Sequence, residues 1–468
     1  MLRKITEWLK GAWYKMIGKS TLQTAIGAEI AVSEPMLKGI EKWAKMYENA
    51  APWLSATVKS LNLPAAIAGE IARIATIEMS VELTGSARAD FLAEQLEPVI
   101  DELREQVEYG AALGGLVLKP FVDGDRVMVD YVRADSFFPL EFDSAGEIRA
   151  AVFVDQRKVG DNHYTRLELH RMTAKGCEIR NQAFRSTTSD TLGQPTSLGV
   201  VPEWAELAPQ ALITGIDRPL FAYFRYPIAN NIDRSSKLGV SCYARAADLI
   251  QQADEQWSVF LWEMESGQRA LYVDLLAFSK DSEGRPILPN KRLYKTLDTG
   301  GQDEALFEDW SPDIRQEDML AGLDATLKRI EYLTGLAYGT LSDPQLVEKT
   351  ATEIATSKQR THSTVVDTQK ALRHALERLI WAMDVWVTID RLAPLGAYEA
   401  AYVFDDSIIV DSEMQFSQDL QLVRDGIMSK VEWRMRNFRE SEEVALEKIA
   451  AARAEQPEVD PFGFGANA

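Results

Sequence analysis

Two short stretches of the sequence contain residue types that belong to known catalytic loops. Gly18-Lys19-Ser20 matches the end of a phosphate-binding loop, in which backbone amides and a lysine hold phosphate groups. The motif needs a glycine five residues before Gly18, and Trp13 occupies that position. Gly239-Val240-Ser241 begins like the turn that presents a nucleophilic serine, but Tyr243 replaces the second glycine that the sharp turn requires. Neither stretch therefore predicts a catalytic site.

Histidine and cysteine residues offer a second kind of chemistry, the binding of a metal ion. His163, His170 and Cys177 are seven residues apart in a region predicted to form strands, where an odd spacing places successive residues on opposite faces. His362 and His374 are predicted to lie on one helix about 120° apart, so they do not share a face. We therefore expect no metal ion, no cofactor and no catalytic residue.

Composition bounds the class of protein. The chain has 468 residues, 46% hydrophobic and 26% charged, which are ordinary globular values. The formal net charge of −20 argues against tight binding of nucleic acid, because such binding depends on clustered Lys and Arg. No apolar run approaches about 18 residues, so we expect neither a membrane span nor export. Cys177 and Cys242 are too few for a disulfide framework, so we expect buried apolar fillers in a reducing cytoplasm.

Basic residues outnumber acidic residues near the amino terminus. Residues 1–60 carry nine Lys and Arg against five Asp and Glu, a net charge of +4. The simpler interpretation is a solvated amphipathic arm that lies on acidic neighbours. The alternative is contact with a membrane surface or with nucleic acid.

Hydrophobic spacing predicts an α+β unit over residues 61–240. Residues 36–110 are predicted to form helices, the clearest being ARADFLAEQLEPVIDELREQVEYG, ended by Gly110. From Leu113 to Phe184, short β-rich runs alternate with turns such as DGD and DSAG, which predicts an antiparallel meander. One more strand, LFAYFRY, follows a polar stretch.

The middle of the chain predicts two helices around a small insertion. The helices cover residues 241–268 and 314–336, and Gly267 and Gly335 end them. Residues 269–313 between them contain β-like runs and an acidic loop, which is most often a solvated face. An insertion this small buries little surface of its own, so it needs neighbours. The acids are Asp298, Asp303, Glu304, Glu308, Asp309 and Asp313.

The stretch Ser342–Met383 has no Gly or Pro after Pro344, so it predicts one very long helix capped by Ser342-Asp343-Pro344. Its first half is rich in Thr and almost without bulky apolar residues. A helix that is polar on all sides has no stable place in an ordinary core. Short helices over residues 413–455 and a disordered tail over 456–468 follow. The second half of the long helix carries Leu372, Leu376, Leu379, Ile380 and Met383.

Three stretches, taken with this order of elements, resemble one family. They are GVSCYARAADLIQQADEQW, GLAYGTLSDPQLVEKTATEI and FDDSIIVDSEMQFSQDLQLVRDGIMSKVEWRMRNFRESEEVALEKI. The chain resembles portal proteins of tailed double-stranded DNA bacteriophages, in the Gram-positive siphophage (SPP1-like) branch, over most of its length. The resemblance implies an α+β portal fold with a wing (61–240), a two-helix stem (241–268 and 314–336), a clip (269–313), a tunnel loop (337–350), a long tunnel helix that returns to the wing (351–412) and a helical crown (413–455).

The resemblance also implies a function. Such proteins form a ring, usually of twelve copies, at one capsid vertex of the virion, and the ring carries DNA during packaging and ejection after assembly in the host cytoplasm. The implied partners are the terminase large subunit, a head-tail adaptor, and the major capsid and scaffold proteins, with no membrane. The polar half of the long helix would line a water-filled channel, and the negative charge would let DNA slide. The residues implied to contact DNA are Asp343, Gln345, Glu348 and Lys349, and those implied to bind partners are Asp298, Asp303, Glu304, Glu308 and Asp309.

A metal-dependent enzyme that acts on DNA or on a small substrate is the alternative. The acids between residues 298 and 313 are of the type that hold metal ions in such enzymes. A ring of about twelve subunits favours the portal, and metal-dependent turnover favours the enzyme.

Overall fold

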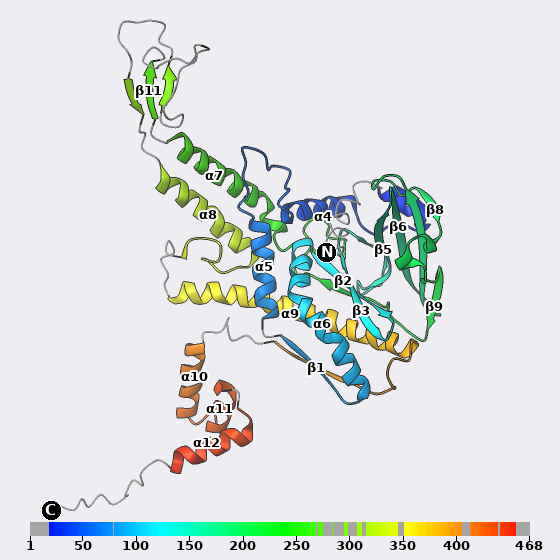
Figure 1. Ribbon diagram of the computed structural model, residues 1–468. Helices are drawn as coiled ribbons and strands as arrows, with labels where there is room; N and C mark the ends of the chain where they lie inside the picture. The colour runs from blue at the N-terminus through cyan, green and yellow to red at the C-terminus, as the bar shows by residue number, and fades with distance from the viewer. Residues whose placement is uncertain are drawn as a thin grey trace, which may run out of the picture. The chain divides into compact units, whose positions relative to one another are not determined.

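A computed structural model describes residues 18–77, 79–267, 270–274, 283, 294–297, 307–310, 315–344, 351–404, 412–438 and 440–454. The chain divides into two compact units, Met1–Phe404 and Asp405–Ala468. The first unit combines helices with mainly antiparallel sheets, and the second contains three helices (Figure 1).

Helices near the amino terminus form part of the main core. α4 buries Met36, Ile40 and Trp43, because apolar residues recur there at helical spacing. On its outer side, Nζ of Lys42 lies 3.4 Å from Oδ1 of Asp248. From Glu34 to Tyr47, the basic region is therefore an amphipathic helix that has one face in the main core and Lys42 beside an acidic neighbour. The helices are α3 (Lys19–Ile26), α4 (Glu34–Tyr47) and α5 (Leu63–Thr76).

The next helix, α6 (Ala87–Leu113), continues past Gly110, where the sequence predicted its end. It ends at Gly114, whose φ of +88° is the left-handed conformation that glycine adopts without strain. Gly110 has a packing role instead. A Cβ there would lie 2.8 Å from Cδ1 of Phe224, so the glycine lets β10 (Ala222–Arg225) approach the helix.

Two antiparallel sheets occur where the sequence predicted one meander. In the first sheet, β10 and β3 flank β2, and both α6 and α9 (Ala351–Ile389) pack on β2. In the second sheet, strands β4 to β8 follow one another in chain order, and β9 pairs with β7. The strands are β2 (Gly115–Asp123), β3 (Arg126–Arg133), β4 (Phe137–Phe142), β5 (Ile148–Val159), β6 (Asn162–Thr173), β7 (Gly176–Ser186), β8 (Gln194–Thr196) and β9 (Gln210–Thr214).

Helices α7 (Ala247–Ser266) and α8 (Gln316–Thr334) pack together as an antiparallel hairpin (Figure 1). Both lie within the ranges predicted for the two central helices. Between them in the chain is a three-stranded sheet in which β11 pairs in parallel with β12 and antiparallel with β13. These strands are β11 (Ala270–Asp274), β12 (Tyr294–Leu297) and β13 (Phe307–Trp310).

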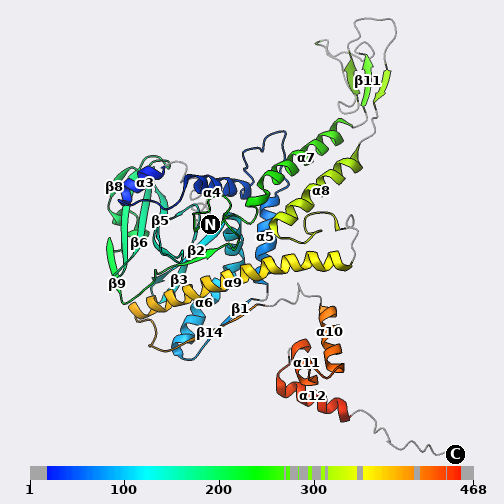
Figure 2. The same cartoon turned by 180° about the vertical axis from the view of Figure 1, so that it is seen from behind.

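Within the described residues, the long helix α9 spans Ala351–Ile389 (Figure 2). Its second half packs against β2, β10 and α5, which confirms the predicted apolar half. After α9, β14 (Glu399–Val403) pairs antiparallel with β1 (Ser80–Thr84). The buried apolar residues include Leu372, Leu376, Leu379, Ile380 and Met383.

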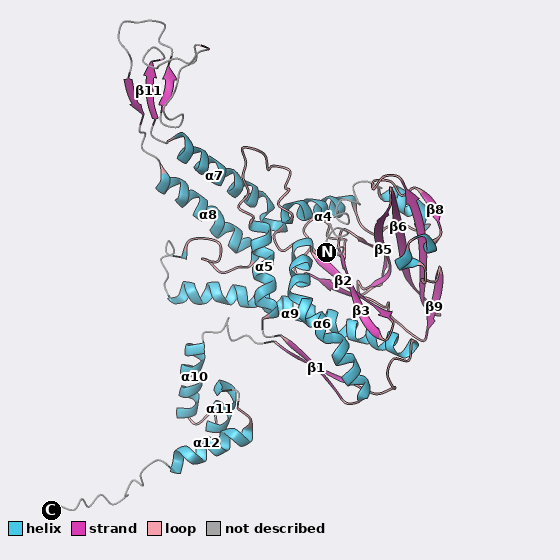
Figure 3. Ribbon diagram, viewed as in Figure 1, coloured by secondary structure: helices cyan, strands magenta, loops and turns pink. Residues whose placement is uncertain are grey.

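The second unit is built from three helices, as predicted for residues 413–455 (Figure 3). The carboxylate of buried Asp419 accepts hydrogen bonds from Nη1 of Arg436 (3.3 Å) and Nδ2 of Asn437 (3.0 Å), which joins the first helix to the second. Across both units, no helix in the described ranges has the length and apolarity needed to cross a membrane. The helices are α10 (Ser412–Arg424), α11 (Lys430–Phe438) and α12 (Glu442–Ala454).

Candidate functional site: the turn between α8 and α9

The turn that follows α8 contains the first residue predicted to contact DNA. Asp343 is exposed near the end of the described part of the turn, residues 335–344. Gln345, Glu348 and Lys349 lie outside the described residues. The site is therefore built from the described part of the turn and the helices that hold it.

Gly335 ends α8 and brings the turn against α9. Its φ of +78° is left-handed, which favours glycine. The carbonyl oxygen of Gly335 accepts a hydrogen bond of 3.2 Å from Oγ1 of Thr364 on α9. A Cβ on residue 335 would collide with this hydroxyl oxygen. The close approach of the turn and α9 therefore requires glycine at this position.

Glu331, on the last turn of α8, holds the backbone of the turn. Its side chain is fully buried. Oε1 accepts hydrogen bonds from the backbone N–H groups of Leu341 (2.6 Å) and Ser342 (2.9 Å). Oε2 accepts a third bond of 2.9 Å from Oγ of Ser342. Hydrogen bonds to an ionised carboxylate are stronger than those between neutral groups, so this contact fixes the turn firmly.

The hydroxyl of Ser342 forms hydrogen bonds within the turn and to α8. The hydroxyl donates to Glu331, and it accepts a bond of 3.1 Å from the backbone N–H of Gly339. Ser342 therefore stabilises the turn itself, because a buried acceptor on α8 lies within its reach. Residues 345–350, which the predicted cap would precede, lie outside the described residues, so the cap stays a prediction.

Asp324 extends this hold to the next residue. Its Oδ1 accepts a hydrogen bond of 2.9 Å from the backbone N–H of Asp343. Its Oδ2 lies 2.7 Å from Nζ of Lys328, one helical turn further along α8. Three successive amides, those of residues 341, 342 and 343, are thus held by two carboxylates of one helix. The side chain of Asp343 remains exposed while its backbone is fixed.

Arg360 of α9 forms a third link between α8, the turn and α9. Its guanidinium carbon lies 4.4 Å from the ring centroid of Tyr332 on α8 and 5.6 Å from that of Tyr338 in the turn. A guanidinium over an aromatic ring is attracted by the electron-rich face of the ring. The turn is therefore bound to both helices that it connects.

The other helix of the hairpin carries a similar contact. Oδ1 of Asp254 on α7 accepts a bond of 2.8 Å from the backbone N–H of Leu61, and Oδ2 accepts one of 2.9 Å from Nε1 of Trp53. The backbone N–H of Lys59 donates to Oγ of Ser258 at 2.7 Å. Burial raises the pKa of Asp254, and the two hydrogen bonds oppose this shift. Each helix of the hairpin thus holds a neighbouring loop through a buried carboxylate.

Sequence reasoning missed Asp324 and Glu331. A signal was present in their position. They fall within the apolar stripe of α8, beside Leu323, Leu327 and Ile330. An acid in such a stripe predicts a buried partner, because an unpaired buried charge is strongly unfavourable.

The acidic residues of the insertion are only partly described. Asp298, Asp303 and Glu304 lie outside the described residues. Glu308 and Asp309 belong to β13, where their backbones pair with Tyr272 and Leu271 of β11. A partner-binding role for these acids stays a prediction.

The spacing argument holds for His163 and His170, which lie on opposite faces of β6, but it is wrong for Cys177, because this residue lies on the next strand, where the register puts it on the same face as His170. Across β6 and β7, His163 pairs with Ser186, His170 with Ile179, and Cys177 with Met172. His170 instead belongs to a buried ion cluster, in which its Nε2 lies 2.7 Å from Oε1 of Glu168. Oε2 of Glu168 also accepts from Nζ of Lys119 at 2.7 Å and lies 3.1 Å from Nη1 of Arg166.

Two pKa shifts follow from this ion cluster. Burial would raise the pKa of Glu168, but Lys119 and Arg166 outweigh burial and hold it well below its ordinary range. Burial lowers the pKa of His170 against the opposing effect of Glu168. The cluster is therefore a structural ion-pair contact between β2 and β6.

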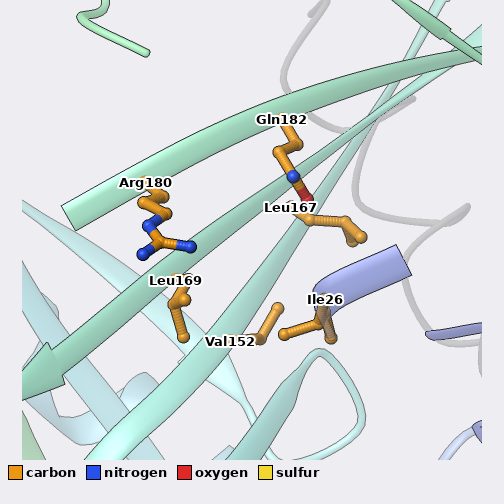
Figure 4. A pocket seen from close by; sticks show the side chains of 6 residues that line it. All are labelled: Ile26, Val152, Leu167, Leu169, Arg180 and Gln182. Carbon is orange, nitrogen blue, oxygen red and sulfur yellow. The ribbon is translucent and has the colours of Figure 1, made fainter. Parts of the chain in front are cut away.

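Two hollows on the first unit lack the acids of a hydrolytic site. The smaller, of about 10 Å³, lies where Ile26 of α3 reaches the second sheet, and Arg180 is the only charged residue that lines it (Figure 4). A hollow of this size holds about one water molecule. The larger lies beside β7 and β8 and is lined by Asn181, Phe184 and neighbouring uncharged residues. Neither hollow offers a pair of titratable groups for acid–base chemistry.

Known proteins similar to this chain were found at two levels. The family described as "Phage portal protein, SPP1 Gp6-like" matches residues 99–459. One solved chain, from "Neck of native GTA particle computed with C12 symmetry", is similar over 89% of this chain and 97% of its own length, with a TM-score of 0.45 and 13% identity. No curated protein sequence matches the chain. The family match covers most of the sequence, including the hairpin, the turn and α9.

Proposed function

Because the chain belongs to the SPP1 Gp6-like family of phage portal proteins, we propose that about twelve copies form a ring whose parts correspond to the elements described above. Phage portal proteins form a ring-shaped channel for DNA at one capsid vertex, they are part of the virion, and they are not enzymes. The alternative of a metal-dependent enzyme is therefore set aside.

One observation carries the assignment of parts: a helical hairpin, a turn fixed by buried carboxylates and a long helix follow one another within the matched residues. In our proposal, α7 and α8 are the stem, and the α+β body is the wing. The strands β11 to β13 are the clip, the helices α10 to α12 are the crown, and residues 337–350 are the tunnel loop that faces DNA.

Electrostatics supports the role of a conduit. The net charge of −20 per chain, repeated around a ring, repels phosphates rather than binding them. The tunnel loop contains Asp343 and Glu348 beside a single basic residue, Lys349. In our proposal, DNA meets weak contacts here and slides without being gripped.

We assign the remaining partners by position and charge. The acids of the clip, including Glu308 and Asp309, would dock the terminase large subunit during packaging and a head-tail adaptor afterwards. The wing would contact the major capsid and scaffold proteins. Each docking is a proposal that a pull-down with the corresponding phage protein tests, with charge-reversed clip acids as the control.

Electron microscopy of the purified full-length protein tests the ring. We expect particles with an axial hole and a mass of about twelve chains. Dispersed monomers at high protein concentration would contradict the proposed assembly.

A double substitution tests the tunnel loop. Replacing Glu348 and Lys349 with Ala should leave ring formation intact and change the length of DNA that is packaged or retained. Unchanged DNA length and retention, with a normal yield of particles, would remove these side chains from the mechanism.

A further inference from the structure

We propose that Glu331 is a positioning residue for the tunnel loop: its buried carboxylate fixes the backbone on which the first DNA-facing residue stands. This inference rests on the proposed function, since the turn acts on DNA only if DNA passes through the ring. It adds a residue of α8, outside the loop, to the parts that set how the loop meets DNA.

Packing alone does not explain an acid at position 331. The neighbouring inward positions of α8 carry Leu323 and Ile330, and an apolar side chain would fill such a site without a desolvation penalty. Within the described ranges, no Lys or Arg forms an ion pair with Glu331, so its charge is balanced by hydrogen-bond donors of the turn. The acid is therefore matched to the turn and to no other described group.

The geometry of these bonds restricts the turn at successive residues. Glu331 accepts from the amides of Leu341 and Ser342, and Asp324 accepts from the amide of Asp343. Rotation of the backbone at any of these residues breaks at least one bond to a carboxylate. The backbone at Asp343 is therefore fixed, and its exposed side chain projects from one place relative to α8.

The other side of the hairpin supplies a matched control. Asp254 of α7 is also buried and also holds a backbone amide, that of Leu61. Its loop precedes α5 and is not the predicted DNA-facing loop. Loss of either carboxylate removes a buried acceptor, but only loss of Glu331 releases the tunnel loop.

The test compares full-length rings that carry Glu331→Ala, Glu331→Gln or Asp254→Ala. Gln keeps one oxygen that accepts the two amides, so it should behave nearly as wild type. In Glu331→Ala rings, amide hydrogen exchange at residues 341 and 342 should become about tenfold faster or more, because these two amides lose their acceptor. Asp254→Ala should leave that exchange unchanged and speed exchange near residue 61.

The functional readout is the length of DNA packaged by phage that carry each variant. Glu331→Ala should alter packaged length, while Glu331→Gln and Asp254→Ala leave it at the wild-type value. The inference is overturned if Glu331→Ala rings package the wild-type length, or if Asp254→Ala changes the length equally. If Glu331→Ala rings do not assemble, Ser342→Ala replaces that variant, since it removes one bond to Glu331 and keeps the backbone.

The outcome also separates this inference from the proposed function. Wild-type protein that forms no ring and supports no packaging would overturn the portal assignment itself. Normal wild-type packaging with no difference among the variants would overturn the role of Glu331 alone.

Discussion

Nε of Arg88 on α6 lies 3.1 Å from Oδ1 of Asp384 on α9, so an ion pair joins the two longest helices of the first unit. Nη2 of Arg88 also donates to Oγ1 of Thr388 at 2.6 Å. The arginine side chain is 1% exposed and the aspartate side chain 29%. Burial raises the pKa of Asp384, and the charge of Arg88 opposes this shift.

We predict that Asp384→Ala lowers the free energy of unfolding by about 3 kcal/mol, because it leaves a buried guanidinium without its counter-charge. Urea denaturation followed by tryptophan fluorescence measures the change. The control is Glu377→Ala on the same helix, which removes an exposed ion pair with Arg373 (2.9 Å) and should change stability by less than about 0.5 kcal/mol. Equal losses of stability in the two variants would show that the Arg88–Asp384 pair does not behave as a buried ion pair.

The end of α6 provides a second prediction. A Cβ on Gly114 would lie 2.7 Å from the carbonyl carbon of Gly239, and φ at Gly114 is +88°. Gly114→Ala should therefore combine steric collision with left-handed strain and destabilise the protein by more than about 2 kcal/mol. Gly124→Ala has a φ of +63° and open space around the new Cβ, so it should show only the strain of about 1 kcal/mol. Thermal unfolding of the two variants under one condition separates the two effects.

Asp135 gives a prediction for pH dependence. Burial raises its pKa from 3.8 to about 6, against the opposing charge of Arg133. The folded state thus binds this proton more tightly than the unfolded state. Stability from this group is present below about pH 4, is lost as pH rises through about 6, and stays lost above that value.

Asp135→Asn should remove this pH-dependent loss and stabilise the protein at pH 7 by up to about 3 kcal/mol. Denaturation midpoints measured between pH 4 and pH 8 provide the test. Asp123→Asn, at an exposed position of β2, is the control and should leave the pH profile unchanged. A parallel profile for wild type and Asp135→Asn would mean that Asp135 is not the titrating group.

The two cysteines yield a prediction about reactivity. Both are free and buried, and burial raises the pKa of the Cys177 thiol to about 11. Thiolate is the reactive form, so a thiol reagent at pH 8 should label the native protein no faster than the protein unfolds. Ser363→Cys, which adds a thiol at an exposed position of α9, should be labelled rapidly. Rapid labelling of wild type would contradict the burial of both thiols.

Local patterns in the sequence were sufficient for the elements that depend on them. The ranges of α7 and α8, the end of α8 at Gly335 and the apolar half of α9 follow from residue spacing and from one helix-stopping glycine. These features are decided by a residue and its near neighbours in the chain, so a single sequence contains the needed information.

Predictions failed where a distant partner decides the role of a residue. Glycine often ends helices, so the sequence predicted a helix end at Gly110. In the structure, Phe224 of β10 packs where a side chain at position 110 would lie. Ser342 has the signature of a helix cap, and that signature does not reveal that its hydroxyl donates to Glu331. Both partners come from another element, and spacing along the chain does not reveal which element that is. The same limit hid Glu331 and Asp324 as the residues that hold the turn.

The pairing of β1 with β14 has a consequence for synthesis on the ribosome. These strands lie near opposite ends of the first unit, and next to them Oγ of Ser86 donates to the carbonyl of Ala397, 311 residues later. The early helix α5 and the strand β2 bury apolar residues against α9. The ribosome synthesises α9 long after α5 and β2. The nascent chain therefore carries exposed apolar surface through most of its synthesis. The first unit can therefore bury these residues only after α9 and β14 have been synthesised, so a subunit cannot complete its first unit, or join a ring through it, before that point.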